Sequence, residues 1–146
     1  MNTDNQHNTF GEFLVAKRRG KEIPSLRVTE ALGISPGYYS DIEKNRRNPP
    51  PDRDTLAKLA EILQLADEDI ATFYDLAGKA RSEAPPDLPD YINQHQVVRV
   101  ALRMAKDSGD ARVWGKFIDL LENEREGNND HAEHRVYTSK NPIHQL

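Results

Sequence analysis

Apolar residues recur every three or four positions along the first half of the chain, which is the spacing of residues on one face of an α-helix. Turn-forming and capping residues divide this pattern into separate segments. The five apolar stripes lie at residues 10–14, 28–32, 39–42, 56–63 and 70–77. The pattern predicts an all-α fold in which five short helices form one domain over residues 9–80.

Residues at the ends of these segments fit the predicted helix boundaries. Thr9 and Glu12 have the spacing of a capping box, in which each side chain satisfies an unpaired backbone amide. Pro24 suits the first turn of the second helix. Gly33 suits the end of that helix, because glycine enters the left-handed conformation at little cost. Asp52 is well placed to cap the fourth helix.

The third segment lies in the sequence SPGYYSDIEKNRRNPP, which brings aromatic and basic residues close together. Ser35 is a good helix cap and Pro36 is a good first-turn residue. Helical spacing brings Tyr39 and Ile42 onto one face, whereas strand alternation would group Tyr39 with carboxylates. The prolines that follow prevent the helix from continuing. We therefore predict a helix over residues 35–45.

The second half of the chain has a different organisation. Residues 81–89 are rich in proline, which indicates a linker. Apolar residues at helical spacing then predict a short helical extension over residues 90–126, with a break at Gly109. Residues 1–8 and 127–146 are polar and without periodicity, and we expect a flexible N-terminus and a disordered tail.

The charge of the chain is unevenly distributed. Residues 9–53 hold nine basic and six acidic residues, a net charge of +3, although the whole chain has a net charge of −4. Residues 54–94 hold three basic and nine acidic residues, a net charge of −6. The acidity of the whole chain therefore does not exclude a local basic face that binds nucleic acid.

Several classes of chemistry find no support in the sequence. The absence of cysteine excludes disulfides, zinc ribbons and thiol nucleophiles. No apolar run approaches the roughly 18 residues of a membrane span, and the N-terminus lacks signal-peptide features, so we expect a soluble cytoplasmic protein. We find no nucleophile–base arrangement and no phosphate-binding loop, so we expect neither an enzyme nor a cofactor. His131 and His134 lie in the predicted tail, and we expect no metal site there.

The second and third predicted helices are joined by about three residues around Gly33. This is the helix-turn-helix arrangement, in which the second helix of the pair can enter the major groove of DNA. Apolar residues at the facing positions are predicted to be buried and to hold the two helices together. These residues are Val28, Leu32, Ile34, Tyr39 and Ile42.

Because its helix-turn-helix carries these apolar residues, the chain resembles the lambda-repressor-like, or XRE-type, family of DNA-binding proteins over about residues 10–77. The stretch LGISPGYYSDIEKNRRNPP is the part most similar to that family's turn, recognition helix and following loop. The family usually has alanine at the position of Thr29, whose hydroxyl can bond to its own helix backbone. The family also pairs an arginine with a glutamate, which correspond by spacing to Arg18 and Glu43. The resemblance implies that this pair is structural.

The resemblance implies a set of DNA contacts on and beside the third helix. The helix residues expected to face DNA are Ser35, Gly37, Tyr38, Ser40 and Asp41. Ser40 can bond to a base edge and Asp41 can accept from cytosine N4, although Asp41 is equally suited to pairing within the domain. Tyr38 can contact a phosphate or a thymine methyl group, or can simply cover apolar surface. The residues expected beside the DNA backbone are Arg27, Lys44, Arg46, Arg47 and Asn48.

Two functions follow as hypotheses. The first is a sequence-specific transcription regulator, a repressor that binds a two-fold operator in double-stranded DNA as a homodimer. The second is an antitoxin, or a regulator held by another protein, in which the C-terminal helices bind the protein partner. The helical extension is too small to form a core alone, so it must pack on the first domain, on a second copy or on another protein.

Overall fold

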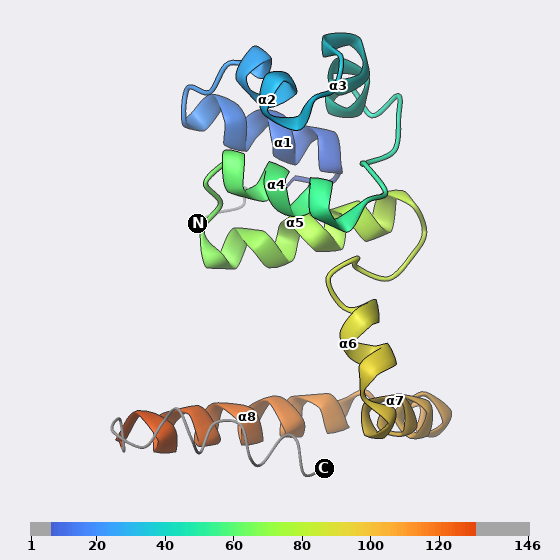
Figure 1. Cartoon of the computed structure of the whole chain (residues 1–146). Coiled ribbons are helices and arrows are strands. Elements are labelled where there is room, and N and C mark those ends of the chain that lie inside the picture. Colours follow the sequence, from blue (N-terminus) through green and yellow to red (C-terminus); the bar gives the residue numbers. More distant parts are fainter. Residues whose placement is uncertain (1–6, 131–146) are drawn as a thin grey trace. The chain divides into compact units, whose positions relative to one another are not determined.

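The computed structural model describes residues 7–130, which form eight helices and contain no strand. The all-α prediction is confirmed. The chain divides into two compact units, with the boundary between Tyr91 and Ile92 (Figure 1). The helices are α1 (Phe10–Gly20), α2 (Ser25–Leu32), α3 (Pro36–Glu43), α4 (Arg53–Ile62), α5 (Asp67–Ala80), α6 (Pro89–Gln94), α7 (Gln96–Ser108) and α8 (Arg112–Asp130).

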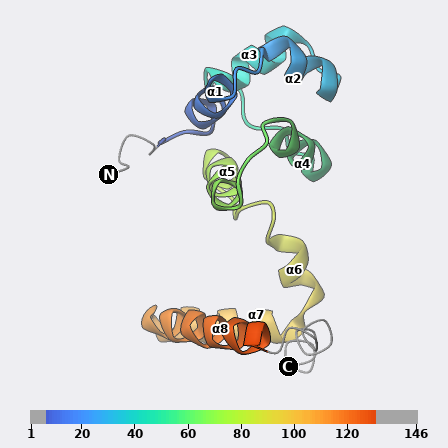
Figure 2. The same cartoon turned by 90° about the vertical axis from the view of Figure 1, so that its left-hand side faces the viewer.

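Helices α1 to α5 pack around a single apolar core in the first unit (Figures 1 and 2). Helix α1 packs against α3 and α5, and α2 packs against α3 and α4. Aromatic rings meet in the core, where the ring centroids of Phe10 and Phe73 are 5.2 Å apart. The buried apolar residues are Phe10, Phe13, Leu14, Ile23, Val28, Tyr39, Ile42, Leu56, Leu59, Ala60, Leu63, Phe73, Leu76 and Ala77.

The predicted capping residues lie at the helix starts. The Thr9 hydroxyl accepts from the amide of Glu12 at 3.2 Å, and the Glu12 carboxylate accepts from the amide of Asn8 at 3.2 Å. The Asp52 carboxylate accepts from the hydroxyl of Thr55 at 2.9 Å and from its amide at 3.0 Å. These hydrogen bonds stabilise the ionised form and lower the pKa of Asp52.

The turn between α2 and α3 has the predicted conformation. Gly33 follows α2 in the left-handed region, with φ of 69°. The Thr29 hydroxyl donates to the carbonyl of Leu26 at 2.9 Å, so the hydroxyl is satisfied within its own helix. The predicted contact residues all contribute to the core: Val28, Tyr39 and Ile42 are buried, and Leu32 and Ile34 are partly buried against them.

The helix boundaries differ from the predicted ones in three places. Helix α3 ends at Glu43 rather than 45, because Asn45 adopts a left-handed conformation with φ of 61°. Pro89 begins the six-residue helix α6, because a proline suits the first turn of a helix. Helix α8 continues to Asp130, so residues 127–130 are helical rather than part of the tail, since no proline interrupts them. The remaining predicted tail and residues 1–6 lie outside the described residues.

The second unit contains the strongly amphipathic helix α7, none of whose side chains is buried. The guanidinium of Arg99 donates to the carbonyls of Ile92 and Asn93, at 2.9 Å and 2.6 Å, and so satisfies the end of α6. Gly109 ends α7 in the left-handed region, with φ of 72°. The Asp110 carboxylate accepts from the amide of Arg112 at 3.0 Å and so caps α8.

Candidate nucleic-acid interface

The first turn of α3 is fixed by its cap. The Ser35 hydroxyl accepts from the amide of Tyr38 at 3.1 Å, and Pro36 occupies the first turn. Tyr39 and Ile42 point into the core, each with only 1% of its surface exposed. The opposite face of this eight-residue helix is therefore turned outward.

An ion pair joins α3 to α1. The Arg18 guanidinium donates two hydrogen bonds to the Glu43 carboxylate, at 2.7 Å and 3.0 Å. It donates a third to the carbonyl of Ile23 at 3.0 Å. Both side chains of the pair are only 11% exposed, and the hydrogen bonds to Glu43 raise the pKa of Arg18. A bidentate pair of this kind fixes orientation as well as distance, so it sets how α3 lies on α1.

The Tyr39 hydroxyl is buried close to this ion pair, yet it makes no hydrogen bond of good geometry within the part of the chain described. Burial is the largest cause that raises the pKa of Tyr39 far above its ordinary value, and the Glu43 carboxylate adds to it. Tyr39 therefore serves the core and stays protonated across the physiological pH range.

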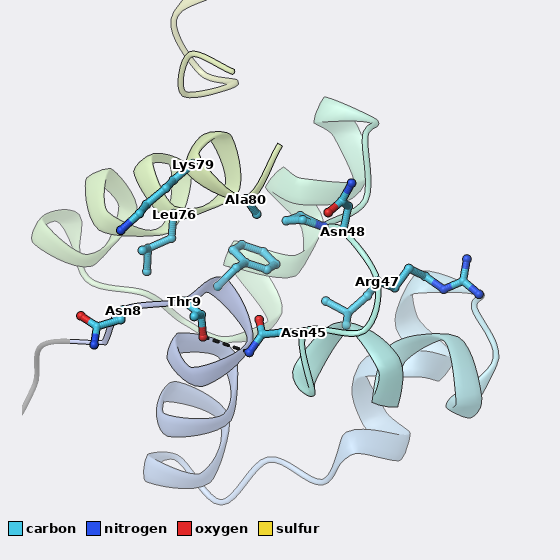
Figure 3. Close-up of a pocket in the computed structure, with 11 residues that line it drawn as sticks. Asn8, Thr9, Asn45, Arg47, Asn48, Leu76, Lys79 and Ala80 are labelled. Carbon is cyan, nitrogen blue, oxygen red and sulfur yellow. Dashed lines mark hydrogen bonds between the residues drawn. The ribbon is translucent and has the colours of Figure 1, made fainter. Parts of the chain in front are cut away.

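A second connection joins the end of α3 to the start of α1. The side-chain oxygen of Asn45 accepts from the amide of Gly11 at 3.0 Å. The side-chain amide nitrogen of Asn45 donates to the Thr9 hydroxyl at 3.0 Å, as Figure 3 shows. A Cβ atom on Gly11 would lie 2.3 Å from the carbonyl oxygen of Glu43. Only glycine allows this approach. We call the contacts of Gly11, Arg18, Glu43 and Asn45 the α1–α3 junction.

Sequence reasoning missed the part played by Gly11 and Asn45 in this junction. Asn45 carried one signal, because asparagine tolerates the left-handed conformation directly after a helix. Its partners lie 34 and 36 residues away in the sequence, and no local pattern connects positions that far apart. Nothing in the sequence around Gly11 indicated that another backbone approaches it closely.

The loop after α3 is held against the end of α5. Pro49 and Pro50 are buried. The Arg81 guanidinium, which the sequence placed in the linker, donates to the carbonyl of Pro49 at 2.7 Å. A hollow of about 290 Å³ lies beside this loop, between Asn45 and the α5 residues Leu76 and Lys79 (Figure 3). The loop that carries the basic residues is therefore anchored at its proline end.

The residues predicted to face DNA lie on the outward side of α3 and differ in exposure. Ser35 and Gly37 are exposed, and Ser40 is half-buried. Apart from its chain neighbours and its own helix backbone, nothing lies within 4 Å of where a Cβ of Gly37 would be, so the backbone there is open to a ligand. The Asp41 carboxylate is 4.0 Å from the Arg46 guanidinium, which agrees with the alternative that Asp41 pairs within the domain.

Tyr38 and Arg47 form a stacked pair at the edge of this surface. The central carbon of the Arg47 guanidinium lies 4.8 Å from the centroid of the Tyr38 ring. Tyr38 also packs against the core and is half-buried. A ring fixed in this way offers the guanidinium a defined resting position through a cation–π interaction.

The predicted backbone-contacting cations are exposed around this surface. Lys44 directly follows α3, Arg46 and Arg47 lie in the loop, and Arg27 lies in the first turn of α2. Among the described residues, Arg27, Lys44 and Arg47 have no ion-pair partner. Asn48, in the same loop, is also exposed. The residues that the sequence predicted to contact DNA thus lie on α3 and its cap, on the loop that follows α3 and in the first turn of α2.

Acidic residues gather on another part of the first unit. Asp67, Glu68 and Asp69 occupy the first turn of α5, and Asp69 pairs with Lys17 at 3.1 Å. Both views of the unit show α2 and α3 on one side and α5 on the other (Figures 1 and 2). The acidic first turn of α5 therefore lies away from α2 and α3.

The described residues contain neither a candidate metal site nor a candidate membrane span. Within residues 7–130, no three His, Asp or Glu side chains are placed so that they could hold a metal ion. His131 and His134 lie outside the described residues. No helix in the described part of the chain is long and apolar enough to cross a membrane.

Comparison with known proteins identifies the segment that contains α2 and α3. Residues 25–70 match the model of a family described as helix-turn-helix, of the XRE or lambda-repressor-like type, and the match begins at the first residue of α2. The resemblance predicted from the sequence is confirmed for these residues. Proteins of this family are DNA-binding transcription regulators, which supports that general function here. The chain matches no curated protein and no solved structure.

The α1–α3 junction predicts the effect of adding a single methyl group to α1. Gly11→Ala places a Cβ against the carbonyl of Glu43, and we expect it to lower the free energy of unfolding by about 1–3 kcal/mol, as overpacking does. Gly20→Ala is the matched control at the other end of α1, where a Cβ meets nothing within 4 Å. Urea unfolding measures both. Equal stability of the two variants would contradict the close approach.

The buried hydroxyl of Tyr39 predicts a pH dependence of stability. The unfolded chain loses a tyrosine proton above about pH 10, whereas the folded chain keeps the proton on Tyr39. The unfolded state then binds fewer protons, so the free energy of unfolding falls as pH rises above 10. We expect Tyr39→Phe to reduce this fall, as measured by urea unfolding between pH 8 and about 11. An undiminished fall in Tyr39→Phe would refute the assignment.

Proposed function

Because residues 25–70 match the helix-turn-helix family model, we propose that this protein regulates transcription by inserting α3 into the major groove of specific DNA sequences. The observation that carries the proposal is the division of α3 into two faces. One face is buried against the core through Tyr39 and Ile42. The other face is turned outward, and the loop that follows the helix carries exposed cations.

The outward face of α3 suits direct contact with base edges. Gly37 presents open backbone to the groove, and Ser40 carries a short hydroxyl that can donate or accept. Asp41 can accept from cytosine N4, provided that Arg46 turns to a phosphate and leaves the carboxylate free. Ser35, at the start of the helix, lies nearest to the groove wall and contacts the backbone.

The cations beside α3 contact the phosphate backbone in this proposal. Arg27 approaches one strand from the start of α2, and the cations at and after the end of α3 approach DNA from the other end of the motif. The latter are Lys44, Arg46 and Arg47, with Asn48 beside them. Each phosphate contact releases counterions, so these residues supply the salt-dependent part of the affinity.

Tyr38 acts chiefly by positioning Arg47. Its ring is half-buried against the core and meets the guanidinium, which limits the orientations that Arg47 samples before DNA arrives. Ordering a long side chain in advance reduces the entropy lost on binding. The stack therefore accounts for the tyrosine without requiring it to read a base.

The proposed regulator is a repressor that binds a two-fold operator in the cytoplasm and needs no cofactor. A domain of about 70 residues that occupies the major groove can block other proteins from the same DNA without further chemistry. A second candidate is a regulator held by a protein partner, such as an antitoxin. The exposed apolar side chains of α7 and α8 favour it.

The phosphate contacts predict how salt affects binding. The double variant Arg46→Ala with Arg47→Ala should weaken binding to all sequences and reduce the slope of log affinity against log salt by about two. Fluorescence anisotropy on DNA from upstream of the protein's own gene measures the slope. Lys58→Ala, which removes an exposed cation on α4, is the control and should leave it nearly unchanged. An unaltered slope in the double variant would argue against the loop as the phosphate-binding site.

The Tyr38–Arg47 stack predicts different effects of two substitutions at Tyr38. Tyr38→Phe keeps the aromatic face and should bind DNA like the wild type. Tyr38→Leu keeps the apolar contact with the core but loses the ring face, and should weaken binding several-fold, corresponding to roughly 1 kcal/mol. In a chain that already carries Arg47→Ala, Tyr38→Leu should not weaken DNA binding further. Weaker binding by Tyr38→Phe would instead indicate that the hydroxyl contacts DNA directly.

A further inference from the structure

The linker predicted at residues 81–89 folds back on the end of α5. The amide of Glu83 donates to the carbonyl of Gly78 at 2.9 Å, and Ser82 adopts a left-handed conformation with φ of 57°. Gly78 is buried, and a Cβ atom on it would lie 2.7 Å from the carbonyl oxygen of Ala84. Because the two backbones touch here, the first residues of the linker have a fixed course along the first unit.

The loop after α3 ends in three successive prolines, Pro49, Pro50 and Pro51. A proline has no amide hydrogen, so this stretch cannot be held by hydrogen bonds from its own backbone amides. It can be anchored only by apolar contacts and through its carbonyl groups. Within residues 7–130, the one hydrogen bond to the stretch comes from the Arg81 guanidinium, which donates to the carbonyl of Pro49 at 2.7 Å.

The Arg81 guanidinium is committed to this contact. The residue is half-buried, and its Nε atom is fully buried without a hydrogen-bond partner in the described part of the chain. A guanidinium that is partly buried and already bonded to a carbonyl has few donors left for a phosphate. Arg81 is therefore placed to hold the loop rather than to bind DNA itself.

The loop residues proposed to contact phosphates lie between two anchored points. Asn45 is bonded to α1, and Pro49 is bonded to Arg81. Only residues 46–48 lie between these points, and all of them are exposed. Two fixed ends so close together restrict the positions that these residues sample, which reduces the entropy that they lose when DNA orders them. Release of Pro49 frees one of the two ends.

We propose that Arg81 is a positioning residue for DNA binding, which sets the course of residues 46–48 by holding Pro49. The DNA-binding domain of this chain then extends through the linker. An ion pair agrees with this extent, because Arg53 at the start of α4 lies 2.7 Å from Asp90 in the first turn of α6. The inference rests on the proposed function, since it takes residues 46–48 to contact phosphates.

The first test measures the loop in the free full-length protein. Arg81→Met removes the guanidinium but keeps a long apolar side chain. We expect the ¹⁵N order parameters of the amides of residues 46–48 to fall in this variant, because one end of the loop is released. Lys79→Met removes an exposed cation two residues earlier and is the matched control, which should leave them unchanged. Unaltered order parameters in Arg81→Met overturn the inference, whether or not the protein binds DNA.

The second test measures DNA binding by the same variants. Arg81→Met should weaken binding about threefold to tenfold, because the loop must then be ordered on the DNA. The slope of log affinity against log salt should stay nearly unchanged, since the complex contains the same phosphate contacts. In a chain that already carries Arg46→Ala with Arg47→Ala, Arg81→Met should weaken binding no further.

Three results of the second test contradict the positioning role. Unchanged affinity in Arg81→Met shows that the loop needs no such anchor. A slope reduced by about one shows that Arg81 binds a phosphate itself. A further loss of affinity in the chain without Arg46 and Arg47 shows that Arg81 acts through other contacts.

A further variant tests the linker without removing a charge. Gly78→Ala leaves Arg81 in place, but its Cβ pushes the linker away from α5. It should lower the order parameters and the affinity in the same direction, whereas Gly20→Ala, where a Cβ has room, should change neither. Circular dichroism verifies that the helices persist in every variant. Wild-type loop order in Gly78→Ala overturns the extension of the domain through the linker. A wild-type protein that binds no DNA refutes the proposed function alone, because the order parameters are measured without DNA.

Discussion

The structure of the first unit depends on how α3 is held against α1. Helix α3 has eight residues, which is too short to persist alone in water, so both its existence and its direction come from tertiary contacts. Burial of Tyr39 and Ile42 stabilises the helix, and the α1–α3 junction fixes its direction at two points. Arg18 binds Glu43 near the end of α3, and Asn45 bonds to the amide of Gly11 just beyond it. Because Gly11 has no side chain, the two backbones can approach closely enough for both connections to form.

This arrangement lets one short helix serve stability and binding together. Burying a residue such as Tyr39 or Ile42 stabilises a fold by about 1.5–3 kcal/mol, whereas an exposed ion pair contributes about 0–1 kcal/mol. The inward face of α3 therefore carries most of its contribution to stability. The exposed cations after the helix contribute little to the fold and remain available to phosphates, and the Tyr38 ring lies at the boundary, packed on the core and stacked on Arg47.

Much of the fold could be predicted from local patterns, because the helices of the first unit have regular apolar spacing and recognisable caps such as Ser35 and Asp52. The Arg18–Glu43 pair came from the family resemblance, since nothing local connects residues 25 positions apart. The roles of Gly11, Asn45 and Arg81 could not be predicted, because each depends on a backbone group brought near only by packing. The helices of residues 90–126 were predicted from apolar periodicity. Periodicity does not show what packs against the exposed apolar side chains of α7 and α8.

The central claim is that α3, fixed by the α1–α3 junction, reads specific DNA sequences. Selection of bound sites from a pool of random double-stranded DNA by the full-length protein tests it most directly. We expect enrichment of one short motif, repeated as inverted half-sites whose centres lie about one helical turn, roughly 10 base pairs, apart. Recovery of DNA without a shared motif, or no recovery above background at low salt, would contradict it.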